Sequence, residues 1–170
     1  IIAATLLAAC GGAGHAGKPT VAGPAEADAM PPAGEWTARA SEGVCVIQAS
    51  IAAGRVQFAV RPASVAIAMG RLGQGGPRLD ASSTAELTFA GTGAGWSLAG
   101  PPFAPNGFGR SVPRKEGGLD LVQAALAGGE FRSTQLDLTI PMPPAAQVGE
   151  AFNSCVAALP AAPPPDASRR

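Results

Sequence analysis

The chain has 170 residues, which suits one domain with flanking segments. Its 12 Lys and Arg residues balance its 12 Asp and Glu residues, so it lacks the basic excess typical of nucleic-acid-binding proteins. Charged residues make up only 14% of the chain, against roughly 25% in ordinary globular proteins, and its 23 glycines and 17 prolines favour turns and short strands over long helices.

The chain opens with nine mostly apolar residues, IIAATLLAA, followed by Cys10. This stretch is too short to span a membrane, because a spanning helix needs about 20 apolar residues. It has the length of the apolar core of a secretory signal, which is about 7–15 residues. No initiator Met or basic region precedes it, so we expect residues 1–9 to be a truncated signal peptide.

The residues Leu7, Ala8, Ala9 and Cys10 resemble the lipobox of bacterial lipoproteins, a Leu and two small residues before a Cys. The resemblance implies that a diacylglyceryl group is attached to the Cys10 thiol and that the signal is cut just before Cys10. Two or more acyl chains hold a protein firmly on a membrane, whereas one chain binds marginally. Gly11 stands where an Asp would signal inner-membrane retention. The resemblance therefore implies the periplasm of a Gram-negative bacterium, with anchoring in the outer membrane.

Residues 10–35 are rich in Gly, Ala and Pro and have no apolar periodicity, which predicts a flexible tether. Gly12, Gly14 and Gly17 form a G-x-G-x-x-G pattern, but this pattern indicates dinucleotide binding only between a strand and a helix. We therefore expect no nucleotide site in the tether. His15, the single histidine of the chain, is expected to be a solvated residue of the same tether.

Residues 36–159 are predicted to form a single β-rich domain, with Trp36 as a core anchor. The segments GVCVIQAS, RVQFAV, SVAIAMG, STAELTF and WSLAG alternate with a period of two and are separated by glycine-containing turns. This pattern is typical of an antiparallel sheet folded into a sandwich or small barrel. The side chains expected to share a face are Val44, Val46 and Gln48; Val56, Phe58 and Val60; Val65, Ile67 and Met69; and Ala85, Leu87 and Phe89.

Two later segments have helical spacing. Residues 119–126 place apolar side chains on one face and end at two glycines, which predicts a short helix. QLDLTI then predicts a strand with Leu136, Leu138 and Ile140 on one face. Residues 145–159 predict a C-terminal helix that ends at a proline, and residues 160–170 predict a disordered tail. The apolar stripe of this last helix consists of Val148, Phe152, Cys155, Val156 and Leu159.

Cys45 and Cys155 remain once Cys10 is assigned to the lipid. An even pair of cysteines in an oxidising compartment favours a disulfide. The alternative is a reactive thiol, which needs a basic neighbour to lower its pKa, and residues 36–159 contain no histidine. We therefore predict a Cys45–Cys155 disulfide that fixes the last helix to the sheet.

The domain shows no pattern of catalytic residues. Without a histidine it has no Ser-His-Asp or Cys-His arrangement and lacks the usual zinc ligands. We therefore expect no catalytic activity, no cofactor and no metal. A carboxylate pair for sugar hydrolysis is the remaining enzymatic alternative. Its candidate residues are Asp80, Glu86, Asp120, Glu130 and Asp137.

Residues 101–118, PPFAPNGFGRSVPRKEGG, are broken by prolines and are predicted to form a long loop. Exposed aromatic side chains next to arginines are common in recognition sites. In the alternative interpretation, the phenylalanines pack under the loop and the charges only solvate it. The candidate binding residues are Phe103, Phe108, Arg110, Arg114 and Lys115.

A family resemblance adds to this interpretation. The chain resembles the small periplasmic β-domains of the invasion-associated locus B type in three features: Trp36 with Cys45 shortly after it, LVQAALAGG leading into a strand, and the closing LTIPMPPAAQVGEAFNSCVAAL. That family implies a secreted, non-catalytic envelope or host-interaction protein. The segment GEWTARASEGVCVIQAS is also similar to the start of bacterial secreted metalloprotease inhibitors.

These features together predict a lipid-anchored protein of the cell envelope, whose non-catalytic β-domain binds a protein or an envelope component. The first alternative is a periplasmic protease inhibitor, and the second is a carboxylate-based hydrolase.

Overall fold

The structure is a computed structural model that describes residues 34–162 except 42 and 74. It contains two antiparallel sheets with two α-helices, which confirms the mainly β fold with a short helix and a C-terminal helix. The two sheets stay separate over the described residues, so the fold is a sandwich and not a barrel. The predicted signal peptide, Cys10 and most of the predicted tether and tail lie outside the described residues.

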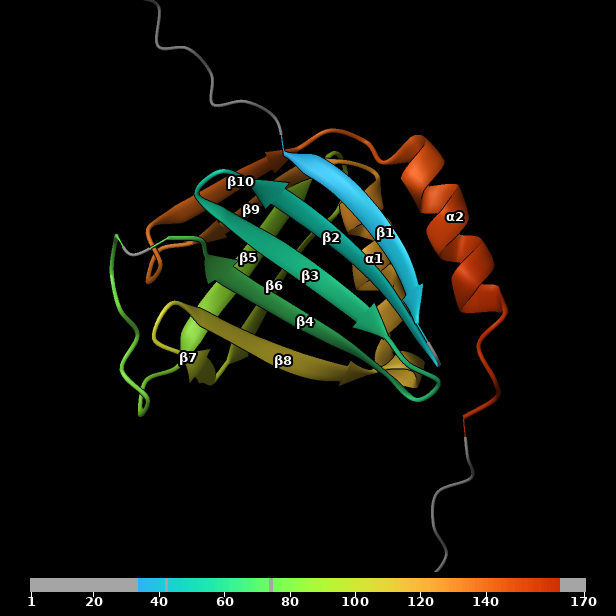
Figure 1. Ribbon diagram of the computed structural model, residues 1–170, viewed down its shortest axis with the longest axis horizontal. Helices are drawn as coiled ribbons and strands as arrows, with labels where there is room; N and C mark the ends of the chain where they lie inside the picture. The colour runs from blue at the N-terminus through green and yellow to red at the C-terminus, as the bar shows by residue number, and fades with distance from the viewer. Residues whose placement is uncertain (1–33, 42, 74, 163–170) are drawn as a thin grey trace, which may run out of the picture. The chain divides into compact units, whose positions relative to one another are not determined.

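The larger sheet has six strands, and the smaller sheet has four (Figure 1). In spatial order the larger sheet consists of β1 (Glu35–Ser41), β2 (Val44–Ile51), β3 (Gly54–Val60), β4 (Ser64–Arg71), β8 (Gly107–Pro113) and β7 (Pro102–Ala104). The smaller sheet consists of β10 (Leu138–Met142), β9 (Gly129–Ser133), β5 (Ala85–Gly91) and β6 (Gly95–Gly100).

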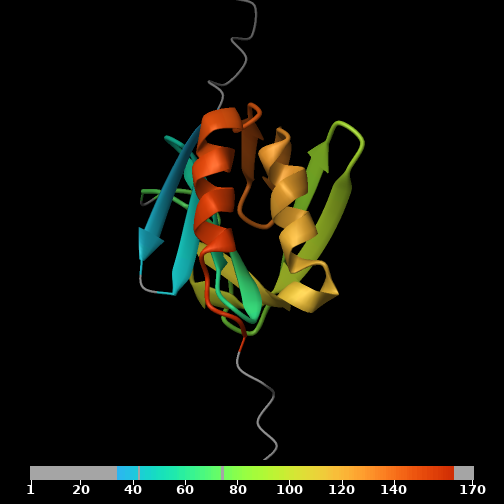
Figure 2. The same cartoon turned by 90° about the vertical axis from the view of Figure 1, so that its right-hand side faces the viewer.

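The two helices fill the open side of the sandwich between the sheets (Figure 2). Helix α1 (Gly118–Leu126) follows the short 3-10 helix η1 (Arg114–Glu116) and contacts β4 and β5. Helix α2 (Ala146–Ala157) packs against β1 and β2. Across the described part of the chain, no helix is long and apolar enough to cross a membrane.

The buried faces of three strands are the predicted ones, and one strand differs. β3, β4 and β5 bury the expected alternate residues. In β2 the residues Val44, Val46 and Gln48 share a face as expected, but this face points away from the core. The core side is formed by Cys45, Ile47 and Ala49, because β2 pairs with β3 so that Ile47 lies opposite Phe58. Both faces of this strand carry apolar side chains, so alternation alone did not decide which face is buried.

The predicted strand QLDLTI begins later than expected. β10 starts at Leu138, because residues 134–137 form a turn in which the Asp137 N–H donates to the Thr134 carbonyl at 3.1 Å. Asp137 has φ 46°, which matches the left-handed conformation that Asp tolerates in turns. Leu136 is nevertheless fully buried. The apolar pattern therefore predicted the burial of Leu136 correctly but placed it in a strand instead of a turn.

A cluster of aromatic side chains joins the two sheets. Trp36 and Phe58 come from the larger sheet, whereas Phe89, Trp96 and Phe131 come from the smaller one. The fully buried Phe131 ring lies 4.9 Å from the Phe89 centroid and 5.9 Å from the Phe58 centroid. Aromatic pairs of this kind contribute about 0.5–1.5 kcal/mol each beyond area burial. The expected role of Trp36 in the core is confirmed, and its indole Nε1–H donates to the Pro143 carbonyl at 2.8 Å.

The predicted disulfide between Cys45 and Cys155 is present and joins β2 to α2. The two cysteines are 110 residues apart in the sequence. In the chain-entropy model, closing a loop of about 100 residues stabilises a protein by up to about 4.7 kcal/mol. The bond therefore holds the C-terminal helix against the sheet, as expected.

The prediction that residues 101–118 form a long loop was wrong, because they contain β7, β8 and η1. β8 pairs with β4 along its whole length, from Ser64 opposite Pro113 to Gly70 opposite Gly107. The strand was missed because Gly107 and Gly109 occupy one of its faces. Glycine is neither clearly apolar nor polar, so the segment shows no alternation of apolar and polar residues. The prolines lie at strand ends or on β7, which is an edge strand, where proline is tolerated.

Close contact between the sheets depends on a glycine at the edge where β6 of the smaller sheet meets β8 of the larger one. A Cβ atom built on Gly100 of β6 would clash with the backbone of Gly109 in β8, whose carbonyl carbon lies 2.8 Å from that position. The residue at position 100 must therefore lack a side chain for β6 and β8 to approach each other.

We expect Gly100→Ala to destabilise the domain by about 1–3 kcal/mol, because the added methyl group forces the two strands apart. Gly75→Ala is the matched control, since its Cβ would meet no atom within 4 Å, and it should stay within about 0.5 kcal/mol of the parent protein. Urea unfolding followed by circular dichroism measures both values. Equal shifts for the two variants would contradict the close approach.

Candidate functional site

The outward face of the larger sheet is lined by unusually small residues on β4 and β8. Val65, Ile67 and Met69 point into the core, so their neighbours Ala66, Ala68 and Gly70 face outward. On β8, Gly107 lies opposite Gly70 and Gly109 lies opposite Ala68. This part of the sheet is therefore a floor of small residues, in which Ala68, Gly70 and Gly109 are half-buried and Gly107 is buried beneath Phe103.

The outward face of the smaller sheet is an ordinary polar surface by contrast. The Ser97 hydroxyl donates to the Glu86 carboxylate across β5 and β6. Arg132 forms an ion pair with Glu130 at 2.9 Å. The charges on this face therefore have protein partners.

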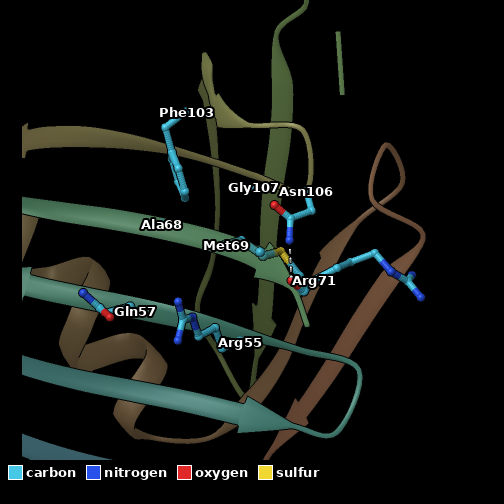
Figure 3. Close-up of a pocket in the computed structure, with 9 residues that line it drawn as sticks. Arg55, Gln57, Ala68, Met69, Arg71, Phe103, Asn106 and Gly107 are labelled. Carbon is cyan, nitrogen blue, oxygen red and sulfur yellow. Dashed lines mark hydrogen bonds between the residues drawn. The ribbon is translucent and has the colours of Figure 1, made fainter. Parts of the chain in front are cut away.

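Above the floor of small residues lies a hollow of about 270 Å³ (Figure 3). Arg55 and Gln57 rise from β3 on one side of it, and Phe103 and Asn106 approach from β7 and the turn after it. Ala68, Gly70 and Gly107 lie between the two sides. Cross-strand pairing fixes the first side, since Arg55 is opposite Gly70 and Gln57 is opposite Ala68.

Phe103 is the most exposed large apolar side chain of the described residues, at 68%. Its ring rests on the backbone of Gly107, because a Cβ there would lie 2.9 Å from the ring Cζ atom. The ring thus presents a flat apolar face to the hollow without being part of the core.

Asn106 is held by a reciprocal pair of hydrogen bonds. Its side-chain Nδ2 donates to the Arg71 carbonyl at 3.0 Å, and the Arg71 N–H donates to the Asn106 carbonyl at 2.8 Å. The side-chain oxygen of Asn106 accepts no hydrogen bond from a described residue, and it faces the hollow (Figure 3). It is therefore a positioned acceptor for a ligand.

The two arginines at the hollow have different roles. Arg71 points away from it (Figure 3), and its Nη1 donates to the carbonyls of Leu136 at 2.9 Å and Asp137 at 2.5 Å. Arg71 thereby ties the end of β4 to the β9–β10 turn. Arg55 is exposed, and its side chain makes no hydrogen bond or ion pair within the described ranges. The guanidinium group of Arg55 is therefore available to a ligand.

The five candidate residues of the predicted binding loop do not gather on one surface. Phe103 lies on the outer side of the sheet, whereas Phe108 is 2% exposed and packs in the core. Arg110 lies at the edge where β8 meets β6, and its Nη1 donates to the Ala99 carbonyl at 3.1 Å. Arg114 and Lys115 belong to η1, beyond the end of β8. Of the five, only Phe103 lines the hollow.

Three residues that line this hollow were not predicted from the sequence: Arg55, Gln57 and Asn106. Arg55 and Gln57 carried a readable signal, because they are the polar, outward positions of RVQFAV and lie two residues apart on one face. What the sequence did not show was that β8 extends the sheet beyond β4 and brings Phe103 and Asn106 to the same face, since residues 101–118 were expected to be a loop. Asn106 lies in the turn between β7 and β8, and nothing in the sequence indicates that its side chain faces the hollow.

The carboxylates proposed for a hydrolase lie on separate elements. Among the described residues, the hollow above β4 and three others on the surface are lined without any Asp or Glu. The backbone N–H and then the hydroxyl of Ser82 donate to Asp80 and hold the pKa of that carboxyl below its usual value. A general acid needs the opposite shift, so Asp80 is a capping residue of its turn.

Comparison with family models, with curated proteins and with solved structures gives no match. In the described ranges, no three His, Cys, Asp or Glu side chains come together as a metal site. The resemblances to lipoproteins and to invasion-associated locus B-type domains therefore stay predictions.

The two phenylalanines of the 101–118 segment provide a direct test of this description. Phe108→Ala should destabilise the domain by about 3–5 kcal/mol, because it leaves a cavity in the core. Phe103→Ala should change stability by less than about 0.5 kcal/mol, because the side chain is largely exposed. Urea unfolding measures both. A large loss of stability in Phe103→Ala would show that this ring belongs to the core and not to a surface site.

Proposed function

We propose that this protein is a lipid-anchored, non-catalytic binding protein of the bacterial cell envelope, which holds a protein or envelope component at the hollow on the larger sheet. The observation that carries the proposal is the pairing of an exposed ring, Phe103, with an unpartnered guanidinium group, Arg55, across a floor of small residues. Aromatic and arginine side chains are the residue types most enriched at binding hot spots.

The composition of the outer face supports a binding role in a second way. Larger polar side chains on β4 and β8 would cover the backbone and solvate the sheet, as they do on the smaller sheet. Alanine and glycine instead leave the backbone accessible to close approach by a ligand. Packing within the sheet also favours small residues here, since a Cβ at Gly70 would lie 3.3 Å from the Asn106 carbonyl oxygen and a Cβ at Gly109 would lie 2.7 Å from the Ile67 carbonyl oxygen.

The proposed location rests on two features of the chain. The LAAC sequence at Leu7–Cys10 supports lipid attachment at Cys10. The Cys45–Cys155 disulfide fits a compartment outside the cytosol, because disulfides persist in the periplasm and are rare in the reducing cytosol. The lipid would keep the hollow close to the envelope surface, with residues 10–35 as the expected tether.

Co-sedimentation with isolated cell-wall and outer-membrane fragments tests the proposal. The protein is the full chain with Cys10→Ser, which removes the lipid and its own membrane affinity. We expect binding that weakens about tenfold, or about 1.4 kcal/mol, in Phe103→Ala and in Arg55→Gln.

The matched control is Arg61→Gln, which removes another exposed arginine just beyond the far end of β3 and should bind like the parent. Equal binding by all four proteins would refute the hollow as the binding site, and an absence of binding to any fragment would refute the function.

A further inference from the structure

The charge at the hollow points to an anionic ligand. Among the residues that line it, the charged ones are both arginines, and no acidic side chain offsets them. Arg71 already donates to two carbonyl groups, whereas Arg55 has all its donors free of other described residues. A guanidinium group presents its donors as a planar fork that matches a carboxylate. The fork of Arg55 therefore favours a carboxylate placed over Gly70, its cross-strand neighbour.

The rest of the hollow suits a ring with one apolar face and a polar rim. Phe103 supplies a flat apolar wall, and Gln57 and Asn106 supply amide donors and acceptors on opposite sides (Figure 3). There is no apolar pit for a peptide side chain, since Met69 is only 1% exposed and its side chain belongs to the core. A sugar ring has this division, with C–H groups on one face and hydroxyl groups around its edge.

The size of the hollow limits the ligand. Its volume of about 270 Å³ lies just below the roughly 300–1,000 Å³ of pockets that enclose drug-sized molecules. The hollow also opens onto the sheet surface, so a longer chain can continue beyond it. One or two sugar rings fill this space, with the remainder of a polysaccharide outside.

We propose that the hollow binds a saccharide that carries a carboxylate group, with Arg55 on the carboxylate, Phe103 against the ring face, and Gln57 and Asn106 on the hydroxyl groups. This inference rests on the proposed function, because it names the envelope component that the same site would take. No bond is made or broken in this binding.

Nuclear magnetic resonance titration of the full chain with Cys10→Ser tests the inference. The probes are three pairs of sugars that differ in the acidic group: glucuronic acid and glucose, galacturonic acid and galactose, and N-acetylmuramic acid and N-acetylglucosamine. We expect at least one acid to shift the backbone amides of Gly70 and Gly107 and to bind at least about tenfold more tightly than its neutral partner. Arg55→Gln should abolish that preference, whereas Arg61→Gln should keep it.

Phe103→Ala should weaken binding of both members of the pair, and Phe103→Leu should weaken it as well, because leucine is apolar but has no flat face. Both variants are expected to fold, since the side chain is 68% exposed.

Three results would overturn the inference. Binding of acidic and neutral sugars with equal affinity would exclude the carboxylate requirement while leaving a saccharide site in place. Shifts caused by inorganic phosphate or by the dipeptide Gly-Asp, and by none of the acids, would replace the saccharide with another anion. No shift with any of the six sugars would exclude the saccharide itself. Co-sedimentation with envelope fragments tests the proposed function separately. If the ligand is a protein of the envelope, the parent would still sediment with the fragments, and Phe103→Ala would bind them more weakly.

Discussion

The disulfide between Cys45 and Cys155 is the constraint on which the arrangement of α2 depends. This helix has only two buried residues, Gly149 and Phe152, and most of its predicted apolar stripe is half-buried. One buried aromatic side chain stabilises a helix by about 1.5–3 kcal/mol, which is little for an element at the end of a chain. The covalent bond to β2 compensates for the small contact and closes one side of the sandwich. Because disulfides persist in oxidising compartments, the same bond supports the proposed location outside the cytosol.

All the aromatic side chains except one pack in or against the core, and the exception lies at the proposed binding site. The chain has six phenylalanines, two tryptophans and no tyrosine. Five of them join the two sheets, and Phe108 and Phe152 are also buried. Phe103 alone is largely exposed, on a three-residue edge strand against Gly107. Its side chain adds little to the packing of the core and is free to contact a ligand. The proposed binding role rests on this contrast.

Sequence periodicity predicted the parts of the fold in which one face of a strand is uniformly apolar. This condition holds for β3, β4 and β5, and the two helices were found by their own spacing. It fails in β2, where Val46 on the outer side mimics a core residue, and in β8, where glycines erase the pattern. The site was therefore only partly predictable. Phe103 was visible as an aromatic residue in a proline-rich segment, but its pairing with Arg55 exists only because β8 extends the sheet beyond β4.

The Cys45–Cys155 disulfide and the proposed lipid anchor at Cys10 both imply a protein outside the cytosol. Intact mass spectrometry of the protein from the membranes of its native host, combined with peptide mapping without reduction, tests both together. We predict a mature chain that starts at an acylated Cys10 and a linked pair of peptides that contain Cys45 and Cys155. A chain that keeps residues 1–9, carries no acyl group and has Cys45 and Cys155 free for alkylation would contradict the account.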